Sequence, residues 1–237
     1  MTVPQRRVGV LVLAAALAVA LLAMLAPAPP AVAVPVSPAP ADDHTAFFAD
    51  GTLAGSGWSA CPGITWTVDA RRLPDGIERR EIRRLAAAVG QWAEASGLDI
   101  RFAGEEPLSY DASRYLLVPR GTPRERHVYL AFLAPRHAPL LASPVVGLGN
   151  PSHVIAETRQ IVGGVAVFRS GFVADASGRD PDRLRNLYLH EFGHVLGLGH
   201  ARTTANVMYP TIDQRVRLGL GDRSGARSLV RPCTVAQ

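Results

Sequence analysis

The stretch His190–His200 reads HEFGHVLGLGH and holds three of the seven histidines of the chain. His190 and His194 are four residues apart, so on a helix their side chains lie on one face, one turn from each other. Zinc favours nitrogen ligands, and a catalytic zinc ion has three protein ligands and one open position. The spacing therefore predicts a helix on which two imidazoles bind one metal ion.

Three further residues complete this pattern. Glu191 follows the first histidine directly, where a carboxylate reaches a metal-bound water as general base. His200 follows His194 by six residues. The chain must therefore leave the helix, and Gly197 is the residue able to turn it with a positive φ. The sequence thus predicts a catalytic zinc site in which His200 is the third ligand.

Together with Met208, these residues form HExxHxxGxxH followed by a methionine turn, which resembles the metzincin metallopeptidases. Val207–Pro210, after an eight-residue gap, resembles the matrixin branch. The resemblance extends over about Cys61–Val230. It implies a zincin-like α+β fold, in which a twisted mixed sheet of about five strands packs with an active-site helix, a second long helix and a short C-terminal helix.

The resemblance also implies roles for residues after the triad. Met208 is expected to form a hydrophobic floor beneath the three imidazoles, without binding the metal. Tyr209 and Pro210 are expected in the substrate pocket. A strand before the active-site helix is expected at the rim of the cleft, where a peptide adds to it as a further strand. Val145–Gly149 is the candidate for that edge, with Ile161–Phe168 deeper in the sheet.

The function implied is a secreted zinc-dependent endopeptidase, a monomer that acts on protein or peptide substrates. One alternative is a catalytically silent zinc-binding module, and another is the same peptidase held at the surface by a membrane anchor. The cysteine-switch motif of latent matrixins is absent from the sequence. A structural zinc or calcium ion has no support, because no His-x-Asp unit and no oxygen-rich loop occurs. The remaining histidines are expected at the surface or at strand edges: His44, His127, His137 and His153.

Composition indicates one folded domain, with 48% hydrophobic and 19% charged residues in 237. The formal net charge is +5, and every basic residue is an arginine. The arginines are scattered rather than clustered, so the sequence gives no reason to expect nucleic-acid binding. No phosphate loop, Rossmann fingerprint or internal repeat appears.

The N-terminus predicts export. An uncharged run, Val8–Ala26, follows Arg6 and Arg7, and the small-residue sites Ala31–Ala33 and Ala39–Ala41 are candidates for cleavage. If the run is not cleaved, it is long enough to serve as a membrane anchor. The predicted organisation is a signal peptide and Pro/Ala-rich leader (1–41), a short pro-segment or linker (42–60), and the catalytic domain (61–237).

Helical spacing and turn residues predict two long helices. The first carries an apolar stripe, with a capping box of Asp75 and Glu78 at its start and Gly97 at its end. The second starts at Asp180 and Pro181 and carries the metal ligands. A short helix is expected over Asp222–Val230. Strands are expected at 64–68, 98–103, 128–133, 145–148 and 161–168.

Cys61 and Cys233 are the two cysteines of the chain. They bracket the predicted domain, and thiols of exported proteins tend to be oxidised, so the hypothesis is one disulfide between them. The alternative is that Cys61 is a thiolate that blocks the zinc.

Overall fold

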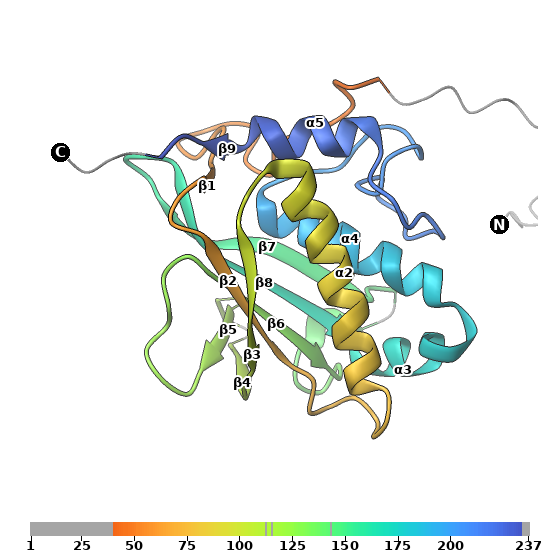
Figure 1. Ribbon diagram of the computed structural model, residues 1–237. Coiled ribbons are helices and arrows are strands. Elements are labelled where there is room, and N and C mark those ends of the chain that lie inside the picture. Colours follow the sequence, from red (N-terminus) through yellow and green to blue (C-terminus); the bar gives the residue numbers. More distant parts are fainter. Residues whose placement is uncertain (1–39, 112, 115, 143, 234–237) are drawn as a thin grey trace, which may run out of the picture. The chain divides into compact units, whose positions relative to one another are not determined.

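The computed structural model describes residues 40–233, except 112, 115 and 143. The chain forms an α+β fold with a mostly parallel sheet, as expected (Figure 1). The described elements are, in order, β1 (Gly57–Ser59), β2 (Ile64–Asp69), α2 (Glu78–Ser96), β3 (Ile100–Glu105), β4 (Leu108–Asp111), β5 (Leu116–Pro119), β6 (His127–Leu133), the 3₁₀ turn η1 (Pro139–Leu141), β7 (Gly147–Ile155), β8 (Gln160–Arg169), α3 (Ser170–Arg179), α4 (Pro181–Leu196), α5 (Leu220–Ser228) and β9 (Val230–Arg231).

The main sheet has seven strands, two more than predicted. Its order is β3-β2-β6-β8-β1-β9, and β7 also pairs with β8. β7 runs antiparallel to β8, whereas the other pairs are parallel. The two unpredicted strands, β1 and β9, have three and two residues, too few to show an alternating pattern. β7 is longer than expected because the polar segment after Gly149 continues the strand to Ile155.

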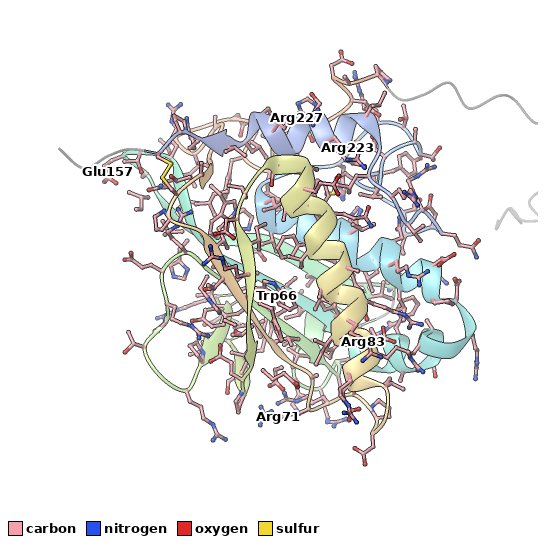
Figure 2. All side chains as sticks on the ribbon, in the orientation of Figure 1. Trp66, Arg71, Arg83, Glu157, Arg223 and Arg227 are labelled. Atoms are coloured by element: carbon pink, nitrogen blue, oxygen red, sulfur yellow. A yellow bond between two sulfur atoms is a disulfide. The ribbon has the colours of Figure 1, made fainter. Side chains whose placement is uncertain are left out.

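Both faces of the sheet are covered. On β6, Val128, Leu130 and Phe132 belong to the core cluster beneath α2 and α4, which also holds Trp66 (Figure 2). The alternate residues of β6 join a second cluster with the β4–β5 hairpin. A strand buried on both faces needs apolar residues at every position, which explains the continuous apolar run that predicted β6.

Helix α2 confirms the predicted apolar stripe but not the predicted cap. Its N-cap is Ile77, and no side chain caps the helix, so the Asp75 capping box is wrong. Residues before Ile77 instead form a turn in which the Ile77 N–H donates to the Pro74 carbonyl. Gly97 ends the helix with a φ of 77°, as predicted. Helix α3 was not predicted at all.

The folded domain begins before Cys61, earlier than the predicted boundary. β1 pairs with β8 and β9 inside the sheet, and Asp43 is buried, so part of 42–60 is integral to the fold. Cys61 and Cys233 form a disulfide, which excludes the zinc-blocking thiolate (Figure 2). The predicted export run and the cleavage site at Ala31–Ala33 lie outside the described residues. Among the helices that are described, none has the length and hydropathy to cross a bilayer.

Candidate metal centre

Helix α4 starts and ends where the sequence predicts. The Asp180 side chain accepts a hydrogen bond from the Arg183 N–H at 3.2 Å, which satisfies one of the free donors of the first turn. Every residue from Asn186 to Leu196 is buried. Gly197 then adopts a φ of 102°, which turns the chain out of the helix and toward His200.

Two buried tryptophans fix the backbone of α4. Trp58 on β1 donates its indole N–H to the Val195 carbonyl at 3.1 Å. Trp92 on α2 donates to the Leu189 carbonyl at 2.9 Å. The helix is therefore held by both the sheet and α2, and the side chains it presents have a rigid base.

The three predicted ligands converge. One nitrogen each from His190, His194 and His200 lies within 4.8 Å of the others. The His190 and His194 Nε2 atoms are 3.1 Å apart. His190 and His194 are buried, whereas His200 is exposed. This geometry brings together the nitrogen set that a single zinc ion needs.

The hydrogen bonds of the two helical histidines fix their tautomers. His190 Nδ1 lies 2.8 Å from the Val207 carbonyl, and His194 Nδ1 lies 2.7 Å from the Leu198 carbonyl. A carbonyl accepts only, so each Nδ1 carries the proton and each Nε2 presents a lone pair. Two lone pairs that face each other at 3.1 Å need a cation between them, and backbone carbonyls behind metal-bound histidines are the usual support.

Burial keeps these rings neutral in the metal-free protein. It lowers the pKa of His190 to about 4 and, with the neighbouring His190, the pKa of His194 to about 3. Burial also lowers the pKa of His200. Neutral imidazole is the form that binds metal, so the donor set fits zinc at neutral pH.

Glu191 lies in the same cleft and is buried. Burial raises its pKa to about 8, against a hydrogen bond from the Gly149 N–H that lowers it. A bound cation nearby favours the charged carboxylate, so a metal ion in the triad would lower the pKa of Glu191. The deprotonated form is the one that acts as a general base. The edge strand approaches closely here, because a Cβ on Gly149 would lie 2.0 Å from the Glu191 carbonyl oxygen.

The methionine turn lies beneath the triad. Met208 is 1% exposed, and a Cβ on Gly193 would lie 2.2 Å from its sulfur. The sulfur therefore packs against α4 at Gly193, which lies between His190 and His194 in the sequence. The buried Asp222 of α5 accepts the Val207 and Met208 N–H groups at 2.8 and 3.2 Å. Sequence reasoning missed Asp222, although an acidic residue in the first turn of the predicted last helix was a signal.

A cleft of about 1080 Å³ opens over the triad and Glu191. Residues 144–152, which include the start of β7, line it, and β8 lies deeper between β6 and β7, as expected. Pro210 lines the cleft, whereas Tyr209 is half-buried and is not among its lining residues. Phe47 and Phe48 also line the cleft, and no pattern in the sequence predicts this position.

The other histidines do not form a second metal centre in the described part of the chain, where the triad is the one group of three ligand residues. His153 is exposed, and His44 and His137 are half-buried. His127 lies at the start of β6 and is fully buried, so the prediction of an exposed position at the surface or at a strand edge is wrong.

The α+β fold, the histidine triad and the methionine turn are together similar to those of the metzincins. The matrixin family model matches residues 171–230, which include α4, the triad and the methionine turn. A stretch of 49 residues is 45% identical to the metalloendoproteinase 4-MMP of Arabidopsis thaliana, and it covers 19% of this chain and 14% of that protein. Over these residues the chain is similar to the matrixin-type metzincins, and the stretch spans only a small part of the curated relative's length.

Proposed function

We propose that this chain is an exported zinc metalloendopeptidase that cleaves protein or peptide substrates. The observation that carries the proposal is the pair of Nε2 lone pairs of His190 and His194 at 3.1 Å, with Glu191 in the same cleft. The match of residues 171–230 to the matrixin family model and the short likeness to a metalloendoproteinase support the same function. The second predicted alternative, retention at the membrane, depends on Val8–Ala26.

In the proposed site His190, His194 and His200 hold the zinc ion. Bound there, zinc supplies Lewis acidity, which lowers the pKa of water and polarises a carbonyl. Glu191 takes the proton from the attacking water and delivers it to the leaving amine. The free edge of β7 pairs with the extended substrate, so the scissile bond is held beside Glu191.

The silent module is the rival function, and the open cleft argues against it. Glu191, the residue that such a module has no need to keep, lines the cleft beside all three histidines. A module used only for binding zinc does not need a groove of about 1080 Å³ along a free strand edge.

Glu191→Gln tests the mechanism, because it keeps the shape of the side chain and removes its ability to accept a proton at neutral pH. We expect peptide hydrolysis to fall by at least about 10²-fold, with zinc content unchanged. Glu157→Gln is the matched control, since Glu157 is exposed in the turn between β7 and β8 (Figure 2). Hydrolysis by Glu191→Gln at the parent's rate contradicts the mechanism, and a zinc-loaded parent inactive on a diverse peptide library favours the silent module.

A further inference from the structure

Residues 43–47, here called the strap, run alongside the loop that carries the third histidine. Ala46 and Leu198 form an antiparallel bridge. Backbone hydrogen bonds of 2.6 and 2.8 Å flank it, from Phe47 N–H to the Gly197 carbonyl and from Gly199 N–H to the Thr45 carbonyl. The strap also lies against α5, since a Cβ on Gly221 would be 2.2 Å from the Asp43 carbonyl oxygen (Figure 1).

Asp43 anchors the strap to the other end of this loop. Its side chain is 1% exposed. One carboxylate oxygen accepts the Arg202 N–H at 2.9 Å, and the other accepts the Thr203 hydroxyl at 2.6 Å and the Asn206 amide at 2.8 Å. Burial raises the pKa of Asp43, but hydrogen bonds from Thr203 and Arg202 outweigh it and lower the pKa to about 2. The anchor is therefore a charged carboxylate whose acceptors are all satisfied from one loop.

The position of His200 depends on this loop, whereas the positions of His190 and His194 are set by helix α4. His190 and His194 stand on a buried helix, and their rings donate to carbonyls. Among the described residues, the ring of His200 has no hydrogen-bond partner, and its backbone carbonyl accepts from the Thr45 hydroxyl at 2.8 Å. The Leu198 carbonyl that supports His194 lies in the same loop, opposite the strap.

We propose that the strap positions the third metal ligand and that Asp43 is the positioning residue on which it depends. The inference rests on the proposed metal site but not on peptide hydrolysis. It assigns a role within the folded domain to the start of residues 42–60, which the sequence predicts to be a short pro-segment or linker. Any N-terminal processing that yields a competent protein must then stop before Asp43, which cleavage at Ala39–Ala41 does.

The test compares Asp43→Asn with Asp42→Asn in the exported protein. Both variants remove one charge, but Asp42 is exposed and Asp43 is buried. In Asp43→Asn an amide faces the N–H donors of the loop, so one of the two acceptor oxygens is lost. We expect the dissociation constant for zinc, measured by chelator competition, to rise by about tenfold in Asp43→Asn and to stay at the parent's value in Asp42→Asn.

Two further readouts separate positioning from general stability. In the metal-free protein, amide hydrogen exchange should accelerate over residues 197–206 in Asp43→Asn. In the cobalt-substituted protein, the visible spectrum should change, because it reports the geometry of the ligands. Thr45→Val removes the bond to the His200 carbonyl from an exposed position, and we expect it to weaken zinc binding by about threefold.

Zinc affinity and cobalt spectra equal to the parent's in both Asp43→Asn and Thr45→Val overturn the proposal. A lower melting temperature of metal-free Asp43→Asn with unchanged zinc affinity also overturns it, because the role is then merely structural. If Asp43→Asn fails to fold, Thr45→Val decides alone. All readouts are taken without peptide, so a protein that binds zinc but lacks peptidase activity counts against the proposed function and not against the strap.

Discussion

The buried imidazoles of the protein lie in two places, the triad and the sheet. In both places Nδ1 carries the proton, and the two places differ in the group that faces Nε2. In the triad, His190 and His194 donate from Nδ1 to backbone carbonyls, and their Nε2 lone pairs face each other. In the sheet, His127 Nε2 lies 3.0 Å from the Arg124 guanidinium, which can only donate. His127 Nδ1 therefore carries the proton and donates to the Thr65 hydroxyl at 2.7 Å.

The difference shows that burial and tautomer do not by themselves make a metal ligand. The chain supplies its own cation to the lone pair of His127, and Glu106 balances that charge by pairing with Arg124. It supplies no donor to the lone pairs of His190 and His194 in the described residues, where the facing nitrogens leave room for a metal ion. His127 is satisfied within the chain, whereas the facing lone pairs of His190 and His194 are left for the metal ion of the proposed site.

The largest expected effect is on metal binding. Removing a ligand with His194→Ala should weaken zinc binding by more than about 10²-fold, beyond the loss seen for residues that merely support a ligand. His127→Gln should leave one zinc ion per chain, because the lone pair of His127 is already occupied. Zinc content after dialysis against a weak chelator, measured on both variants, checks the pair.

Loss of zinc from His127→Gln would show that the triad and His127 are coupled. If His194→Ala binds zinc as tightly as the parent, the triad is not the metal site. The contrast between the triad and His127 is then wrong.

The convergence of the three histidines could be predicted from the sequence because each part of the pattern is local. A helix with histidines at i and i+4, a glycine that turns the chain and a methionine a few residues later all follow from short-range geometry. His127 was misjudged because what buries it is distant: Thr65 comes from β2 and Arg124 from the loop before β6. The sequence around His127 does not indicate that these distant residues will surround it.

The strap and α3 were missed for related reasons. Asp43 makes its bonds with residues about 160 positions later, and a segment that pairs through one bridge shows no periodicity. Helix α3 has two glycines and two serines among ten residues, so its intrinsic helix propensity is low. Packing stabilises it instead: Val173 is in the core, and Ser177 contacts the buried Glu81 of α2.

The second prediction concerns stability and pH. Burial and the charge of Arg124 lower the pKa of His127 to about 4. In the unfolded chain the ring has its ordinary pKa of about 6.5. The neutral ring therefore contributes stability that is fully present above pH 6.5 and is lost as the pH falls toward 4. Between pH 7.5 and 5 this loss amounts to about 1–2 kcal/mol.

Urea unfolding of the metal-free parent and of His127→Gln at both pH values measures it. Both proteins carry the same triad, so the difference between their free energies of unfolding isolates His127. We expect this difference to shrink by the stated amount at pH 5. A difference that does not change with pH means that His127 titrates normally in the folded protein.

The smallest expected effect is on the pKa of His127 itself. Arg124→Met removes the donor to Nε2 and a positive charge that lowers this pKa, and it leaves the Glu106 carboxylate without its ion-pair partner. Both changes favour the protonated ring, so the pKa should rise from about 4. It should stay below 6.5, because burial is the larger cause of the shift and remains. Titration of the ring protons by NMR in the metal-free protein measures the change, with the exposed Arg120→Met as the control.

An unchanged pKa in Arg124→Met would mean that the guanidinium does not satisfy the lone pair, and the contrast between the triad and His127 would lose its physical basis. If the pKa rises as expected, zinc binding offers a further check. The variant frees one lone pair, but among the described residues no two other ligand groups lie close enough to complete a site around His127. Zinc stoichiometry should therefore stay at one per chain, because a metal centre needs several converging lone pairs and a rigid base that presents them.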